Sequence, residues 1–254
     1  MYEKWFAGYT AQICSRISGA SLIEADLKTE HSYLVRDRCR EIAQSLNLPE
    51  RDIELATVIG LFHDLGRFRQ ALNFGTMDDR ITGPHGEMSA DVFREEAPKD
   101  GLSDEEIEII DCALRYHNVF RLPQSLSGRP LLFTQIARDG DKLDIFRFYT
   151  DKKESRGFRF IMSEEPGECS PEMLEGALNG ENLRVSGIRN ASDRKLMQVS
   201  LVYDLNFGYS FEWMLKKDYL AVITGVSDGT ADTAMHRVYD YATSWIKKKL
   251  QELA

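Results

Sequence analysis

Histidines and aspartates are the residues of this chain whose types and spacing could do chemistry. The chain has five histidines, and four of them lie in its first half: His31, His63, His85 and His117. Each of the four falls on, or at the end of, a different expected helix and stands beside apolar residues. Neutral imidazole is the commonest metal ligand, and side chains from several helices can converge inside a bundle. Together they indicate a metal site, although a single helical histidine is more often a core or surface residue.

The adjacent pair His63-Asp64, in the stretch GLFHDLGRF, is stronger evidence for a metal than any single histidine. Neighbouring residues on a helix point about 100° apart, so both side chains can lean toward one ion at the helix end. A local hydrogen bond or a helix cap is the alternative interpretation of this pair.

Three aspartates lie on an otherwise apolar expected helix, in the stretch ARDGDKLDIFRF: Asp139, Asp141 and Asp144. A buried carboxylate must be paired or must coordinate a metal. The alternative is that one or two of the three face water.

The order His31, His63-Asp64, Asp141 resembles the HD superfamily of metal-dependent phosphohydrolases. In that family a first histidine, a His-Asp doublet on the next helix and a later aspartate bind a divalent metal. Here EHSYLVRDRCREIA resembles the first-histidine helix, ATVIGLFHDLGRF the doublet and DGDKLD the segment of the final aspartate. The resemblance covers about residues 25–150, and the three segments together are specific where a lone His-Asp dipeptide is not.

Two further histidines match the dinuclear members of the family, His85 in GPHGEMSA and His117 in ALRYHNVF. They fall where those members carry extra histidines between the doublet and the last aspartate. Asp64 has two carboxylate oxygens and can join both ions. The resemblance implies a first ion held by His31, His63, Asp64 and Asp141, and a second ion held by His85, His117 and a bridging Asp64. The fifth histidine, His236, lies outside the resemblance and is expected to be structural.

Ligation by histidine and aspartate without thiolates suits divalent ions other than soft copper. We expect one or two ions per chain, drawn from Fe, Mn, Ni, Co, Zn or Mg, with Fe or Mn preferred. Such ions make hydroxide available near neutral pH and bind phosphate oxygens.

We expect Asp64, Arg67 and Lys142 to be the catalytic residues. Arg67 and Lys142 are included because binding a phosphate also needs cations from the protein. Arg67 follows the doublet, and a guanidinium can grip two phosphate oxygens. Lys142 stands beside the last metal-binding aspartate. For Arg121 and Arg138 a surface salt bridge is the preferred interpretation.

A leaving group needs a proton, from water or from a carboxylic acid, and the sequence does not choose among Asp79, Glu87 and Asp139. The loop 73–83 lies between two ligand-bearing elements. We therefore expect it to form part of the rim of the substrate site.

The resemblance implies hydrolysis of a phosphate mono- or diester in a small phosphorylated substrate, with nucleotides among the candidates. The Gly-Tyr-Pro motif of the subfamily that acts on cyclic dinucleotides is absent. The same ligand order also resembles that of mixed-valent diiron oxygenases such as myo-inositol oxygenase, which is the main alternative. A non-catalytic sensor with the HD fold ranks last, since every expected ligand is present.

The fold class expected from hydrophobic periodicity is all-α, an HD-like helical bundle with additional C-terminal helices. The short apolar run 219–226 is compatible with either a strand or a helix. Gly66 is expected to end the helix that carries the His-Asp doublet. From 151 to 190 the helical signal weakens. Helices are expected over 23–46, 50–63, 85–96, 103–117, 130–149, 193–204, 209–215 and 230–250. We expect residues 1–150 to form the metal-binding domain and residues 151–254 to pack on it as one structural unit.

The chain has 254 residues and a formal net charge of −9, which argues against general binding of nucleic acid. Its four cysteines, spaced as neither a zinc ribbon nor a disulfide framework, are expected to be reduced thiols: Cys14, Cys39, Cys112 and Cys169. Without a signal peptide or a membrane-length apolar run, we expect a cytoplasmic protein, with homo-oligomerisation left open.

Overall fold

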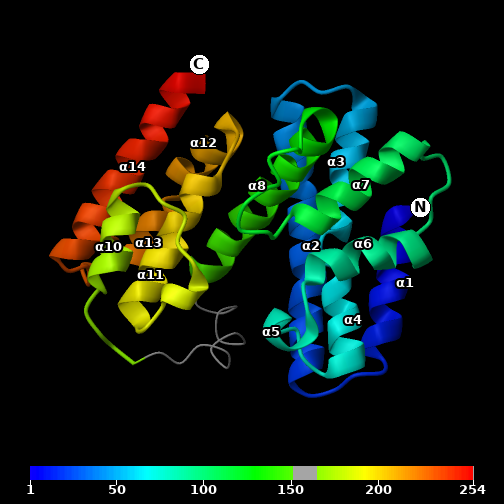
Figure 1. Cartoon of the computed structure of the whole chain (residues 1–254), viewed down its shortest axis with the longest axis horizontal. Helices are drawn as coiled ribbons and strands as arrows, with labels where there is room; N and C mark the ends of the chain where they lie inside the picture. Colours follow the sequence, from blue (N-terminus) through cyan, green and yellow to red (C-terminus); the bar gives the residue numbers. More distant parts are fainter. Residues whose placement is uncertain (151–164, 254) are drawn as a thin grey trace. The chain divides into compact units, whose positions relative to one another are not determined.

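Helices are the only regular elements in the part of the chain that the computed structural model describes, residues 1–150 and 165–253 (Figure 1). The expected all-α class is therefore confirmed. None of the described helices is long and apolar enough to cross a membrane. The chain divides into two compact units, Met1–Asp144 and Ile145–Ala254. Packing of residues 151–254 on the metal-binding domain stays a prediction.

The first unit contains seven complete helices and most of an eighth, which continues past the boundary between the units. Their bounds are α1 Tyr2–Cys14, α2 Ala20–Ser45, α3 Glu50–Phe62, α4 Leu65–Phe74, α5 Asp79–Thr82, α6 His85–Glu96, α7 Asp104–Tyr116 and α8 Gly128–Thr150.

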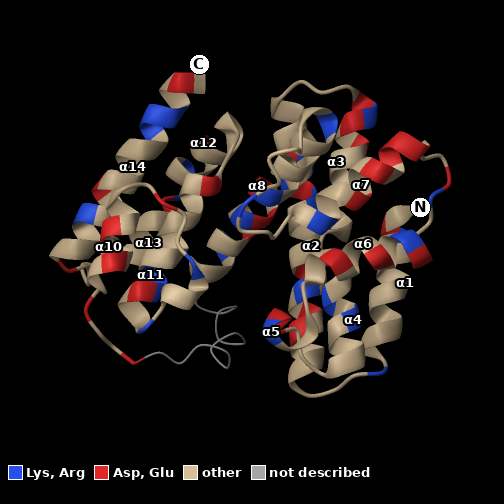
Figure 2. Ribbon diagram, viewed as in Figure 1, with Lys and Arg blue, Asp and Glu red and all other residues tan. Residues whose placement is uncertain are grey.

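Local sequence explains where α7 begins. The Ser103 hydroxyl accepts a hydrogen bond from the Glu106 amide at 3.2 Å, and the Glu106 carboxylate accepts one from the Ser103 amide at 2.8 Å. This confirms the capping box expected from the sequence. Acidic residues fill the first turn of α7, where the helix dipole favours negative charge (Figure 2). Arg51 of α3 also donates to Glu106, at 2.6 and 2.8 Å, and so ties the two helices together.

The core of the first unit is aromatic. Phe6 of α1 packs edge-on against Phe68 of α4 with ring centroids 5.9 Å apart, and stacks near Phe62 of α3 at 6.5 Å. Phe93 of α6 lies 6.4 Å from Phe62. All four rings are fully buried. Burying side chains of this size supplies several kcal/mol each, about 1.5–3, and fixes the helices around the doublet.

Small residues let α2 approach two of its neighbours closely. A Cβ atom on Gly60 of α3 would lie 2.8 Å from Sγ of Cys39, and one on Gly140 of α8 would lie 2.6 Å from the same sulfur. Real Cβ atoms essentially never come this near, so both positions need glycine. The buried thiol of Cys39 thus lies between α3 and α8 near the residues expected to bind metal.

The expectation that Gly66 ends the doublet helix is wrong. α3 ends at Phe62, and a new helix, α4, begins at Leu65 and includes Gly66. The new helix α4 runs through Gly66 because Leu65, Phe68 and Ala71 fall on one buried face. The role of Gly66 is close packing: a Cβ there would lie 2.3 Å from the carbonyl oxygen of His85 on α6.

The second unit is helical wherever it is described. The ambiguous run 219–226 contains a short helix, α13, and the part of the weak region over 151–164 lies outside the described residues. The elements are α10 Pro171–Leu178, the 3-10 helix η1 Val185–Gly187, α11 Ala191–Ser200, the 3-10 helix η2 Leu201–Asp204, α12 Gly208–Lys217, α13 Tyr219–Thr224 and α14 Thr233–Leu253.

A buried carboxylate accepts three hydrogen bonds near the start of this unit. Asp193 of α11 accepts hydrogen bonds from the amide and hydroxyl of Ser170, both at 2.7 Å, and from the Arg189 amide at 3.1 Å. The indole of Trp245 on α14 packs against Phe211 and Tyr203. These contacts belong to a core within the second unit.

Candidate metal centre

The structure brings together all six residues expected to bind metal. His31 lies in the middle of α2, and His63 and Asp64 form the two-residue junction between α3 and α4. The other three lie at the start of α6, directly after α7 and on α8: His85, His117 and Asp141. Five of the six are buried, and the side chain of Asp141 is 16% exposed. The centre is thus inside the first unit, and Asp141 on α8 is its most exposed member.

The four imidazoles form two pairs that face each other through Nε2. The Nε2 atoms of His31 and His63 lie 3.1 Å apart, and those of His85 and His117 also lie 3.1 Å apart. The rings of His63 and His117 are in edge contact, with centroids separated by 5.2 Å, so the two pairs adjoin.

The opposite ring nitrogen, Nδ1, faces an acceptor in every case. In each pair one ring faces a carboxylate: Nδ1 of His31 lies 2.6 Å from Asp144, and Nδ1 of His85 lies 2.7 Å from Asp79. The other ring of each pair faces a backbone carbonyl three residues earlier: His63 faces Gly60 O at 2.8 Å, and His117 faces Leu114 O at 2.7 Å. At His31, His63 and His117 these acceptors favour the tautomer with hydrogen on Nδ1, which leaves the Nε2 lone pair pointing inward. Nδ1 of His85 also lies 3.0 Å from the side-chain amide nitrogen of Asn118.

Asp64 lies between the two imidazole pairs and offers one oxygen to each. Oδ2 lies 3.3 Å from Nε2 of His63 and 3.6 Å from Nε2 of His31. Oδ1 lies 3.3 Å from Nε2 of His85 and 3.8 Å from Nε2 of His117. A single carboxylate therefore joins the two halves of the centre.

The halves differ in their second carboxylate. Asp141 adds an oxygen to the first half only, 3.1 Å from Nε2 of His31 and 3.7 Å from Nε2 of His63. Two sets of ligand atoms are close enough to hold one ion: His31, His63 and Asp141, and His63, Asp64 and His117. The first set contains three of the four residues implied for the first site and lacks Asp64. The second contains His63 where the resemblance implied His85.

Charge in the centre reinforces this arrangement. Burial alone would raise the pKa of Asp64, but Lys28 and His63 outweigh burial and hold it well below its usual value. Burial lowers the pKa of His85, with Arg67 adding to the effect, and burial lowers that of His117 further. Asp64 is thus held ionised and the imidazoles of His85 and His117 are held neutral, which is the protonation state that metal ligands require. The pKa of His31 is shifted the other way: burial and Lys28 lower it, but its hydrogen bonds with Asp141 and Asp144 outweigh them and raise it.

A divalent cation fits this donor set. Two Nε2 lone pairs at 3.1 Å repel each other unless a cation or a proton lies between them, and the same geometry occurs twice. Nitrogen and oxygen donors without thiolate suit borderline and hard divalent ions. The donors that each half offers are His31, His63, Asp64 and Asp141 in the first, and His85, His117 and Asp64 in the second.

Arg67 lies beside the centre, held by the segment that precedes α6. It donates to the Met77 carbonyl, to Oδ1 of Asp79 at 2.8 Å and to Oε1 of Gln70 at 3.1 Å. Its Nε is buried without a hydrogen-bond partner and lies 3.8 Å from Oδ1 of Asp64. The free Nε–H of Arg67 therefore lies beside the half of the centre that contains His85.

Two other cations considered from the sequence, Lys142 and Arg138, both lie on α8. Lys142 is buried and donates to the Arg138 carbonyl, one turn earlier on α8, at 3.4 Å. The preferred interpretation of Arg138 as a surface residue is wrong: it is buried and donates to the carbonyls of Tyr116, His117 and Val119. It thereby closes the C-terminal end of α7, where the last carbonyls of a helix need donors.

Asp79 is one of the three carboxylates considered as proton donors. Its carboxylate contacts both His85 and Arg67. Glu87 is exposed on α6, and Asp139 is buried on α8. The expected loop 73–83 contains the single-turn helix α5, which places Asp79. Gln70 fixes this turn by donating to Asp79 and Thr82.

Sequence reasoning missed two residues of the centre. Lys28 had not been considered, and its Nζ lies 2.6 Å from Oδ2 of Asp64. Asp144 had not been separated from the other aspartates of α8, and it proves to be the partner of His31. Both lie one helical turn from a metal-ligand position, Lys28 before His31 and Asp144 after Asp141.

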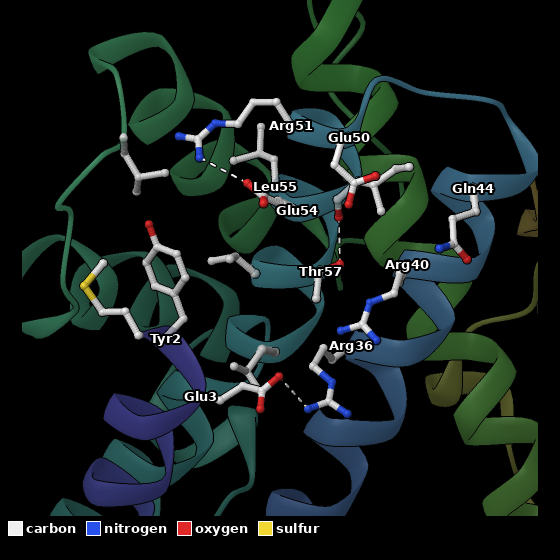
Figure 3. Close-up of a pocket in the computed structure, with 15 residues that line it drawn as sticks. Tyr2, Glu3, Arg36, Arg40, Gln44, Glu50, Arg51, Glu54, Leu55 and Thr57 are labelled. Carbon is white, nitrogen blue, oxygen red and sulfur yellow. Dashed lines mark hydrogen bonds and ion pairs between the residues drawn. The ribbon is translucent and has the colours of Figure 1, made fainter.

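A separate open pocket of about 480 Å³ lies between α1, α2 and α3 (Figure 3). Its arginines face carboxylates: Arg36 contacts Glu3 at 3.0 Å, and Arg51 contacts Glu54 at 3.3 Å. None of the six expected metal ligands lines it.

Residues 29–145 match the family model described as HD domain. No curated protein and no solved structure matches the chain. Proteins with this domain are generally metal-dependent phosphohydrolases. The matched range includes all six residues of the buried histidine–aspartate cluster, so residues 29–145 of the chain form an HD domain.

Proposed function

We propose that this chain is a metal-dependent phosphohydrolase that hydrolyses a phosphate mono- or diester of a small molecule, with nucleotides among the candidate substrates. The observation that carries the proposal is the sharing of Asp64 between two imidazole pairs, each with its Nε2 atoms turned inward. Two ions held in this way would supply a Lewis acid for phosphate oxygens and a hydroxide at neutral pH.

The ligand assignment is part of the proposal. The first half has four donor side chains and the second has three, so the second half leaves more positions for water or substrate. The second half is also the one that the free N–H of Arg67 adjoins. We therefore place the phosphate at the second half, with Arg67 binding a phosphate oxygen.

Asp64, Arg67 and Lys142 remain the proposed catalytic residues, with different degrees of support. Asp64 is supported by its contacts with both imidazole pairs, and Arg67 by its unpartnered Nε. Arg67 is also pre-positioned, because Asp79 and the Met77 carbonyl fix the other side of its guanidinium. A preorganised cation costs little reorganisation when charge develops on the phosphate. Lys142 is proposed on its place beside Asp141 alone.

The first experiment is to measure metal identity and metal content per chain on protein purified without oxygen and without a chelating tag. His31→Ala and His85→Ala each remove one ligand, and His236→Ala is the matched control because His236 is exposed on α14 of the second unit and is none of the six expected ligands. We expect two ions in the wild type and in His236→Ala. We expect about one ion in each of the other variants.

Activity is then measured on a panel of phosphate mono- and diesters, including nucleotides, with the metal found in the protein. Release of phosphate or alcohol by the wild type, lost in Asp64→Asn and in His31→Ala, would support the hydrolase. Iron in both positions together with O₂-dependent consumption of a substrate would point instead to the diiron oxygenase. Absence of metal after reconstitution would refute the enzyme.

A further inference from the structure

Lys28 makes the shortest contact that any described cation makes with Asp64. Its Nζ lies 2.6 Å from Oδ2, whereas the nearest nitrogen of Arg67 lies 3.8 Å from Oδ1. Oδ2 is also the oxygen that faces His31 and His63. The ammonium therefore occupies the edge of the first half of the centre.

The ion pair is largely removed from water, with the side chain of Lys28 19% exposed and that of Asp64 2% exposed. An ionised carboxylate buried to this degree costs free energy unless a cation compensates it. In protein without metal, Lys28 supplies that compensation. Its short distance is typical of a charge-assisted hydrogen bond between two ionised groups.

We propose that Lys28 competes with the metal for Oδ2 of Asp64, and that it sets the affinity of the first half of the centre for its ion. The inference rests on the proposed function, because it requires the cluster to bind metal. An ammonium and a divalent cation repel each other, so both cannot stay close to one carboxylate oxygen without cost. Binding of the ion therefore moves Nζ away, and the exposed part of the side chain gives it a path to solvent.

The competition has two consequences. Protein without metal stays folded because Lys28 takes the place of the ion beside Asp64. Metal binding is weaker than the ligand set alone would give, because each binding event must break a short ion pair. Lys28 is therefore a positioning residue that acts through Asp64.

The test uses Lys28→Met, which keeps the length of the side chain and removes its charge. Lys4→Met is the matched control, since Lys4 is exposed on α1 of the same unit. The dissociation constant for Mn²⁺ is measured by calorimetry on chain stripped with a chelator, and the thermal midpoint is measured with and without Mn²⁺.

We expect Lys28→Met to bind Mn²⁺ about tenfold more tightly or better, because ions no longer displace an ammonium. Without metal this variant should unfold at a lower temperature than the wild type, and saturating Mn²⁺ should close the difference. Lys28→Arg retains the charge and should stay near the wild-type affinity. Lys4→Met should change neither quantity.

Equal or weaker Mn²⁺ binding by Lys28→Met would overturn the inference; weaker binding would mean that the ammonium only orients Asp64. If the stripped variant does not stay folded, its affinity is measured on loaded protein by competition with a chromophoric chelator. Failure of the two proposals can be told apart. Equal affinities in wild type and variant refute the role of Lys28 alone, whereas no Mn²⁺ uptake by either protein refutes the metal-dependent function as well.

Discussion

Gly66→Ala tests whether the close crossing of α4 and α6 holds the second half of the centre together. The added Cβ would lie 2.3 Å from the carbonyl oxygen of His85, 2.8 Å from Cβ of Met88 and 2.8 Å from the amide nitrogen of Ser89. Ordinary contacts of this kind begin at 3.4 Å. Two of the three contacts are with backbone atoms, so no side-chain rotation can relieve them. The helices must separate by about 1 Å, carrying His85 away from Asp64.

The magnitude combines three effects. Overpacking of a tight interface costs about 1–3 kcal/mol. Separation of the helices also weakens the buried hydrogen bond from the Gly66 amide to the Ser89 hydroxyl, 2.9 Å long, which contributes about 1 kcal/mol. Alanine recovers about 0.5–1 kcal/mol through its better helix propensity. We expect the free energy of unfolding to fall by about 1–3 kcal/mol.

The assay is urea unfolding of metal-free protein followed by circular dichroism, with metal content measured on loaded protein. Gly8→Ala is the matched control, because Gly8 lies inside α1 and a Cβ there meets nothing within 4 Å. That variant should be as stable as the wild type or slightly more stable. Gly66→Ala should also bind less metal, with the loss confined to one of two ions. Wild-type stability and metal content in Gly66→Ala would refute the role of the crossing.

Three other predictions follow from the ion pairs and from metal binding. Contacts with Arg51 lower the pKa of Glu106 to about 2, so this carboxylate stabilises the fold above pH 4.5, and its contribution is lost as the pH falls toward 2. Glu106→Gln should therefore cost about 1–2 kcal/mol in urea unfolding at pH 7, and that difference should shrink through this acid range. Asp144→Asn should weaken binding of the first ion and Asp79→Asn that of the second, each by about tenfold or more in metal titrations. Mn²⁺ held about a hundredfold above its dissociation constant should raise the unfolding free energy by about 2.7 kcal/mol for each site that it fills, and a chelator should reverse this.

Local signals in the sequence were sufficient for most helices of the first unit. The α7 start depends on Ser103 and Glu106, which satisfy each other within one turn, and such a motif needs no distant partner. The start of α6 at His85 also agrees with the expectation, because the signal for it is local: a proline directly precedes it. Gly66 was misjudged because a glycine after an apolar run suits two situations, a helix end and a close crossing. Only the position of α6 distinguishes them.

The six expected ligands came together, but their pairing could not be predicted from the order of residues along the chain. Sequence order gives no information on which imidazole faces which, or on which ring nitrogen is turned inward. Those features depend on the acceptors at Nδ1, two of which are backbone carbonyls, Gly60 O and Leu114 O. Any residue type at those positions offers the same carbonyl, so side-chain identity carries no signal for them.

The residues that sequence reasoning missed act on the centre through another side chain. Lys28 acts through Asp64, and Asp144 acts through His31. Lys28 precedes His31 by three positions and Asp144 follows Asp141 by three, and residues three apart on a helix share a face. A search for charged residues one turn from each expected ligand would therefore have found both. It would not have found the contact of Asp79 with His85, six positions apart, because that contact depends on the turn made by α5 and not on a helical repeat.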